Sequence, residues 1–146
     1  MVCSKYFFHE ETFDWSTARE KCSDEENSSL VSMETEKEWH FVHNLTKKNQ
    51  RTKVRWFIGL ERVNKSYSWS WLSESIARVN ETSTGTWRWN AGEPNNIKTE
   101  KCGEMMKNGR YNNIRCQADK YGDNPGYICE KHFSKFMIMP KLCYPN

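Results

Sequence analysis

The chain has 146 residues, a formal net charge of +3, and a composition that is 36% hydrophobic and 14% aromatic. This length suits one domain spanning 1–146 with a single core, and the weak positive charge excludes an argument for nucleic-acid binding. Because no run of about 18 apolar residues occurs, the sequence predicts no membrane segment. We find no secretory signal at Met1 and expect a processing boundary there.

The first part of the chain predicts a strand, a helix and a short extended link. Residues 5–13 are rich in aromatic side chains, which favours a strand. Asp14 is expected to cap a helix, because apolar side chains follow it at helical spacing until the pattern fades by Asn27. Residues 28–33 then read as an extended link.

A second helix is predicted from Glu36 to about Lys47. Thr35 and Glu38 have the spacing of a capping box, in which the two side chains satisfy backbone N–H groups of the first turn. The buried stripe of this helix is expected at Trp39, at Val42 or Phe41, and at Leu45.

The second half of the chain predicts several strands and one long loop. Asn108-Gly109 indicates a tight hairpin turn between two of these strands. The loop at 73–101 is long for a compact domain, which is typical of a functional segment. The strands are expected at 55–63, 66–72, 102–107, 109–116 and 127–133. Helices and strands in this order predict an α+β fold.

The cysteines and glycosylation motifs indicate an extracellular location. Six cysteines show no CxxC or Cys/His zinc spacing, and their even number suits three disulfides. Four Asn-X-Ser/Thr sequons are candidate N-glycosylation sites, at Asn27, Asn44, Asn64 and Asn80. We therefore expect a secreted protein or the ectodomain of a membrane protein.

The segment Gly92-Glu93-Pro94-Asn95-Asn96 carries more polar chemistry than a turn requires. Glycine and proline alone would predict a turn, and a turn needs neither Glu93 nor Glu100 further along the chain. These oxygens either face solvent from a loop or hold a ligand.

Six motifs together resemble the C-type lectin-like domain, in order and in approximate spacing. They are Trp15…Ala18…Cys22, "WFIGL", "GEPNN", Glu100 two residues before Cys102, "YNNIRC" and "YICEK". The resemblance covers about residues 5–132, is closest to selectin-like and mannose-receptor-like members, and leaves 133–146 as a C-terminal extension. It implies two helices that flank two small antiparallel sheets, with the termini close together.

The resemblance also implies disulfide pairs. It implies the pairs Cys22–Cys129 and Cys102–Cys116, and it leaves Cys3 and Cys143. We expect Cys3–Cys143 to pair, while an intermolecular bond through Cys143 stays open as the alternative.

An oxygen-rich set of residues matches the calcium site of that family. Calcium takes six to eight oxygen ligands from carboxylates, amide carbonyls and water. The resemblance implies one calcium ion held by Glu93, Asn95, Glu100, Asn112 and Asn113, after a cis Glu93-Pro94 bond. It implies carbohydrate binding through Glu93, Asn95, Glu100 and Asn112. The order Glu93 then Asn95 is similar to the mannose, GlcNAc and fucose class, and several copies of the domain would add avidity for glycans on glycoproteins or cell surfaces.

The chain departs from the family pattern at four positions. Asn113 stands where an Asp is usual, so two formal charges would face calcium, and we expect a weak site of about 10⁻⁴–10⁻³ M. Tyr111 replaces a usual Trp. Asn96 and Lys101 replace acidic residues of a second calcium site, so at most one site is expected.

Two other binding functions remain open at the sequence level. The same fold could serve as a protein-binding receptor domain that binds no sugar. Alternatively, a basic cluster could bind polyanionic glycans through charge, with members Lys47, Lys48, Arg51, Lys53 and Arg55. Loss of binding on calcium chelation would separate the lectin from both alternatives.

Other residue patterns do not indicate catalysis. No nucleophile motif, phosphate loop or activated cysteine is present, so an enzyme is not expected. His40 and His43 are expected to be a surface pair, because no third metal ligand lies at a suitable spacing. Trp87 and Trp89 either stack on a sugar or anchor the long loop in the core.

Overall fold

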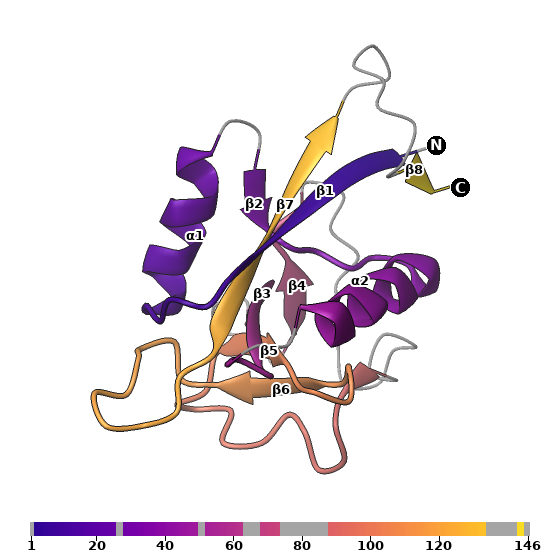
Figure 1. The fold of residues 1–146 in the computed structure, drawn as a ribbon. Helices are drawn as coiled ribbons and strands as arrows, with labels where there is room; N and C mark the ends of the chain where they lie inside the picture. Colours follow the sequence, from indigo (N-terminus) through magenta and orange to yellow (C-terminus); the bar gives the residue numbers. More distant parts are fainter. Residues whose placement is uncertain are drawn as a thin grey trace.

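The computed structural model describes residues 2–25, 28–49, 52–62, 68–73, 88–133 and 143–144, the backbone alone for 2, 3, 143 and 144. The described elements follow the predicted strand, helix, helix and strand order of an α+β domain (Figure 1). They are β1 (Val2–His9), α1 (Trp15–Asp24), β2 (Ser28–Leu30), α2 (Glu36–Lys48), β3 (Trp56–Arg62), β4 (Trp69–Trp71), β5 (Cys102–Met105), β6 (Tyr111–Ile114), β7 (Gly126–Phe133) and β8 (Cys143–Tyr144).

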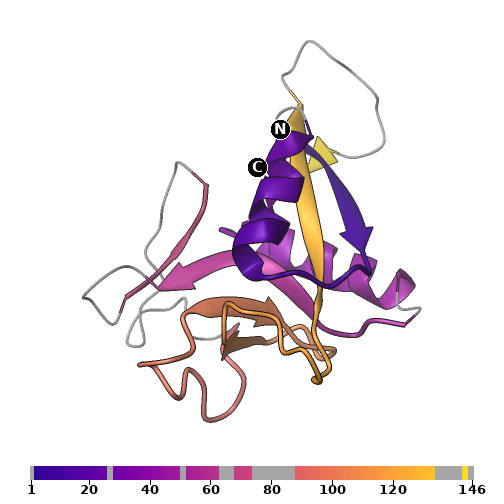
Figure 2. The ribbon, with the colours of Figure 1, turned by 90° about the vertical axis from the view of Figure 1, so that its left-hand side faces the viewer.

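The strands form one mixed sheet rather than two separate ones. Their order is β6-β5-β3-β7-β1-β8, with β4 paired to β3 and β2 paired to β7. Every pairing is antiparallel except that of β3 with β7, which joins Trp56 to Gly126 and Phe57 to Tyr127. This short parallel contact connects the two antiparallel groups that the family resemblance implies. Figures 1 and 2 show α1 and α2 on either side of the paired strands β1 and β7.

Helix α1 begins where it was predicted but is capped differently. Asp14 occupies the N-cap position, yet its carboxylate accepts a hydrogen bond from Ala118 N at 2.6 Å and none from the helix. Trp15 N donates to Cys116 O at 2.7 Å. Asp14 is therefore at the predicted N-cap position, but the prediction that its side chain caps the helix was wrong. The start of α1 is hydrogen-bonded to the segment after β6 instead.

Helix α2 shows a modified form of the predicted capping box. The Thr35 hydroxyl accepts from Glu38 N at 3.2 Å, as expected. The Glu38 carboxylate instead accepts from Glu34 N at 3.1 Å, one residue before the predicted donor. The buried positions are Trp39, Val42 and Thr46, whereas Leu45 is half-buried. The buried Thr46 hydroxyl is satisfied because it donates to His43 O at 2.7 Å.

Aromatic residues fill the core, in agreement with the composition. All six tryptophans among the described residues are at most 7% exposed. One cluster packs α2 against β3, β4 and β6, and a second surrounds α1 and β7. Trp69 and Trp71 of β4 both lie in the first cluster. Met105 also lies there, and Met137 and Met139 are outside the described residues.

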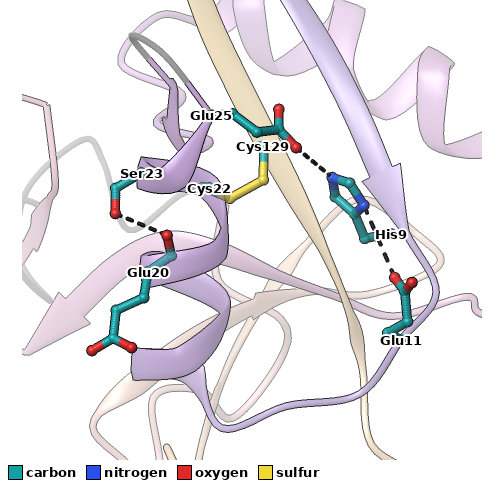
Figure 3. Close-up of a disulfide and its surroundings, with 7 residues drawn as sticks. All are labelled: His9, Glu11, Glu20, Cys22, Ser23, Glu25 and Cys129. Atoms are coloured by element: carbon teal, nitrogen blue, oxygen red, sulfur yellow. Dashed lines mark hydrogen bonds and ion pairs between the residues drawn. A yellow bond between two sulfur atoms is a disulfide. The ribbon is translucent and has the colours of Figure 1, made fainter.

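Two of the three expected disulfides are present. Cys22–Cys129 joins α1 to β7, and Cys102–Cys116 closes the β5–β6 hairpin (Figure 3 shows the first of these). The backbone of Cys3 lies opposite that of Cys143 where β1 pairs with β8. The Cys3–Cys143 bond stays a prediction that this backbone register permits. No helix within the described residues is long and apolar enough to cross a membrane.

Candidate functional site

The segment between Trp89 and β5 is anchored at both ends against the β5–β6 hairpin. Trp89 forms a backbone bridge with Tyr111, and Asn90 N donates to Tyr111 O at 2.8 Å. At the other end, the Cys102–Cys116 disulfide holds the start of β5 beside the segment that follows β6. The hairpin turn itself contains Gly109 at φ +82°, a conformation that favours glycine. This arrangement places the predicted oxygen-rich loop at one end of the domain (Figure 1).

Glu93 and Asn95 form a closed pair at the tip of this loop. The Glu93-Pro94 bond is cis, as the family resemblance implies. Asn95 donates to one Glu93 oxygen from its side chain, at 2.8 Å, and to the other from its backbone, at 3.1 Å. Both carboxylate oxygens therefore lie on the Asn95 side of the turn.

Asn113 joins the loop to β6 through its neutral amide. The side chain is 1% exposed, and its Oδ1 accepts from Asn95 N at 2.9 Å. Its Nδ2 donates to Asn95 O, and to Glu100 O at 3.2 Å. A carboxylate only accepts hydrogen bonds, so the Asp that is usual here could not make the two donated bonds.

Glu93 and Glu100 bring negative charge close together. Partial burial raises the pKa of Glu93, and the nearby Glu100 charge raises it further, while the Asn95 backbone N–H opposes both effects. The Glu100 charge disfavours the ionised form of Glu93, an effect that a nearby cation would offset.

Asn112 has a different hydrogen-bond partner from its neighbour Asn113. Its Nδ2 donates to Glu104 Oε1 at 2.9 Å. Glu104 is fully buried, and Arg55 Nη1 lies 3.3 Å from the same oxygen. Burial raises the pKa of Glu104, whereas the Asn112 hydrogen bond and the Arg55 charge lower it. Direct hydrogen bonds thus link Glu93, Asn95, Asn113 and the Glu100 backbone. Asn112 is hydrogen-bonded to Glu104 instead.

Sequence reasoning did not identify Glu104 as part of the site. The available signal was its position two residues after Cys102 in a buried strand, where a carboxylate is unexpected. The cross-strand register places Glu104 directly opposite Asn112.

The aromatic residues near the loop are structural. Trp89 is 5% exposed and packs edge-to-face with Trp69, so it anchors the loop in the core and is not available to stack on a sugar. Tyr111 is buried against Trp71, which explains how it fills the usual Trp position. Trp87 lies outside the described residues.

The predicted basic cluster is only partly available for an anion. Lys53 donates to Asn124 O at 2.8 Å and lies 3.7 Å from Asp123. Arg55 pairs with Asp123 as well as with Glu104. Lys47 and Lys48 are exposed at the end of α2, and Arg51 lies outside the described residues. Ion pairs within the domain therefore occupy two of the five cations.

The histidines have separate environments. His40 lies 3.7 Å from Glu36, and His43 packs against Trp39, with its pKa lowered by burial. His9 lies 3.5 Å from Glu25 and 4.0 Å from Glu11 (Figure 3). Cys129 sulfur is close to His9 and Glu25, but it is bonded to Cys22, so only two metal ligands remain there.

A second acidic pair lies between α2, β1 and β7. Tyr6 hydroxyl lies 3.3 Å from Glu38 and 3.4 Å from the buried Glu130. Burial raises the pKa of Glu38 to about 7, with a further contribution from the Glu130 charge, and burial also raises the pKa of Glu130. Ser32 N donates to Glu130 at 3.4 Å, and His132 lies 3.5 Å from it.

One of the four sequons lies within the described residues. Asn44 is exposed on α2, whereas the Thr46 of its sequon is buried. Asn27, Asn64 and Asn80 fall outside the described residues, and glycosylation at all four sites stays a prediction.

Comparison with known proteins identifies the family. The family model "Lectin C-type domain" matches residues 11–131, which is most of the chain. The chain belongs to the C-type lectin domain family. It is 30% identical to "C-type lectin domain family 4 member M" of Gorilla gorilla gorilla over 95% of this chain and 31% of that protein. It is 32% identical to human "C-type lectin domain family 17, member A" over 88% of this chain and 30% of that protein.

A solved structure shows the same fold. The cow CD23 carbohydrate-recognition domain, determined in the presence of a GlcNAc2Man3 oligosaccharide, aligns with a TM-score of 0.69 and 24% identity, over 92% of each chain. At this identity the likeness supports the fold alone.

Membership in the family sets the class of function. C-type lectin domains are non-enzymatic carbohydrate-recognition modules, so the chain is a lectin-like domain and not an enzyme. Domains of this family generally bind calcium, take glycan or protein ligands, and are typically extracellular. The chain spans about a third of the length of the curated relatives described here.

Proposed function

We propose that this domain binds glycans of the mannose, GlcNAc and fucose class in a calcium-dependent manner, as the recognition module of an extracellular or cell-surface protein. The observation that carries the proposal is the convergence of Glu93, Asn95, Glu100 and Asn113 at one loop–strand junction. The Glu93-Asn95 order favours this sugar class over galactose, as the family resemblance implies.

The donor set fits one calcium ion. Calcium prefers oxygen ligands, and the candidate ligands Glu93, Asn95, Glu100, Asn112 and Asn113 offer carboxylate and amide oxygens. The Glu100 charge disfavours ionised Glu93, and a cation at the loop tip would offset this effect. The Asn113 amide, however, is engaged by the loop backbone and contributes no charge. We therefore propose a single weak site, of about 10⁻⁴–10⁻³ M. Bound calcium would supply open positions for sugar hydroxyls.

The side chains at the loop tip would orient the sugar. A carboxylate such as Glu93 accepts the proton of a hydroxyl, and an amide such as Asn95 donates to the same hydroxyl's oxygen. Few contacts of this kind give weak binding to one sugar. Useful strength would come from several copies of the domain presented together.

A calcium-dependent glycan array is the direct test. The multimerised domain is applied to the array in calcium and again in EDTA. Binding to mannose- or fucose-containing glycans that EDTA abolishes is the expected result. Absence of binding in calcium, or binding that EDTA leaves intact, contradicts the proposal.

A matched variant tests the role of the loop tip. Glu93→Gln combined with Asn95→Asp is expected to shift preference toward galactose, because it exchanges the acceptor and donor positions around the sugar hydroxyls. Glu20→Gln combined with Gln117→Glu is the control, since it makes a charge-neutral exchange at two exposed positions outside the oxygen set.

A protein-binding domain without sugar recognition is the second candidate. The hydrogen bonds of Asn113 close the loop without an ion, and this observation favours a structural role for the loop. A protein ligand captured equally well in calcium and in EDTA would support this candidate.

A further inference from the structure

We propose that Glu104 is a positioning residue that fixes the amide of Asn112 so that its Oδ1 is the atom presented to calcium. This inference rests on the proposed function, because it assigns a task to a residue behind the proposed ligand set. Glu104 lies on β5 directly across from Asn112 on β6.

The chemistry of the contact determines which way the amide faces. An ionised carboxylate only accepts hydrogen bonds, whereas an asparagine side chain has one donor end and one acceptor end. Glu104 Oε1 lies 2.9 Å from Asn112 Nδ2, so the donor end faces Glu104. The acceptor atom, Asn112 Oδ1, has no hydrogen-bond partner among the described residues and stays available as an oxygen ligand.

Arg55 holds Glu104 in place. Its guanidinium donates to the same Oε1 at 3.3 Å, and its other nitrogen donates to the backbone of Asp123. Glu104 is fully buried, and its Oε2 has no partner among the described residues. A buried carboxylate with one oxygen unsatisfied carries a cost, which needs a compensating role. Positioning a metal ligand is such a role.

The contact lies next to the other candidate ligands. In the β5–β6 register, Glu104 lies opposite Asn112, and the next pair joins Gly103 to Asn113. The Glu104–Asn112 contact is therefore one residue from Asn113, which is bonded to the loop. Residues that orient metal ligands through hydrogen bonds change metal affinity by about 10–100-fold when they are replaced.

A double-mutant cycle separates positioning from folding. Glu104→Gln alone is expected to lower calcium affinity by about tenfold or more, measured by calorimetry, because the neutral amide holds Asn112 less firmly. In an Asn112→Asp background the same Glu104→Gln change is expected to raise affinity. In that background the introduced amide can donate to the introduced carboxylate, whereas the native Glu104 carboxylate repels it. A purely structural Glu104 would act in the same direction in both backgrounds.

A second measurement needs no calcium. In EDTA, nuclear magnetic resonance of the Asn112 side-chain NH₂ is expected to show a hydrogen-bonded proton that Glu104→Gln weakens. Asp123→Asn is the matched control, because it removes the other carboxylate near Arg55 without touching Asn112. This control should leave both the amide signal and calcium affinity close to wild type.

The outcomes distinguish this inference from the proposed function. Wild-type calcium binding that Glu104→Gln leaves unchanged overturns the role of Glu104 and leaves the proposed function standing. Wild-type protein that binds no calcium by calorimetry overturns the calcium-dependent function, and the role of Glu104 with it. Reversal of sign between the two backgrounds, with thermal unfolding in EDTA unchanged, supports the inference.

Discussion

Two regions of the domain differ in how they are held together. In the first, around the Cys22–Cys129 bond, α1 packs buried side chains against β2 and β7. In the second, the loop between Asn90 and Lys101, no residue is buried. The first region is stabilised by apolar burial and by a covalent bond between residues 107 positions apart. The second is held by polar contacts, above all those of Asn113, and by a disulfide that spans only 14 positions.

This difference indicates that one region mainly stabilises the domain and the other mainly binds the ligand. Apolar burial and a long-range disulfide give a scaffold whose geometry does not depend on a ligand. A typical hydrogen bond contributes about 1 kcal/mol net, so an ion or a sugar can compete with the contacts that hold the loop. We therefore expect scaffold changes to alter unfolding and loop changes to alter binding.

Removing the scaffold disulfide should have the largest effect. Replacing Cys22 and Cys129 by Ala is expected to cost roughly 2–5 kcal/mol of unfolding free energy, because a long loop is no longer closed in the unfolded chain. Replacing Cys102 and Cys116 by Ala is the matched comparison. It should cost less stability, since the closed loop is shorter, but should weaken calcium binding more. Chemical denaturation and calorimetry measure the two effects, and an equal loss of both properties in the two variants would contradict this distinction.

Replacing Asn113, whose hydrogen bonds hold the loop, should have an intermediate effect. The variant should be less stable than wild type in EDTA but should bind calcium more tightly. Asn113→Asp removes two donated hydrogen bonds, so in EDTA we expect a loss of about 1–3 kcal/mol in thermal unfolding. The added charge should raise calcium affinity roughly tenfold. Gln117→Glu adds the same charge at an exposed position outside the loop, and it should leave stability in EDTA unchanged. If Asn113→Asp unfolds in EDTA at the same temperature as wild type, the Asn113 hydrogen bonds do not hold the loop.

A pH effect on the scaffold should be the smallest. Because the pKa of Glu38 is raised from 4.5 to about 7, the folded protein binds more protons than the unfolded chain between these values. Its contribution is therefore complete below about pH 4.5 and is lost as the pH rises through about 7. Glu38→Gln should reduce this dependence and stabilise the protein above pH 7 by on the order of 1 kcal/mol, while a dependence from Glu130 remains because burial raises its pKa as well.

Thermal unfolding across this pH range measures the effect. The exposed Glu20 on α1 offers the control, and Glu20→Gln should keep the wild-type dependence. A Glu38→Gln protein that keeps the full wild-type loss of stability between about pH 5 and 8 would assign the pH dependence to groups other than Glu38.

The chain order of the elements was readable from local patterns. Helical spacing after Asp14, the capping sequence at Thr35 and the Asn108-Gly109 turn each specify a short-range conformation, and the structure has an element at each of these places. The family motifs added the two observed disulfides and the cis bond before Pro94. Such features depend on neighbours in sequence or on a shared motif, which is why they could be predicted.

Contacts between distant segments were decided only by the tertiary structure. No local pattern shows that Asp14 bonds Ala118, that Thr46 is buried where Leu45 was expected, or that β3 pairs with β7. The candidate ligands could be named from the sequence, but the register of β5 and β6 decides that Glu104 lies opposite Asn112, and only the fold shows that Asn112 and Asn113 have different partners. Register depends on cross-strand packing summed over the whole sheet, so the motif supplied the residues and the fold supplied their orientation.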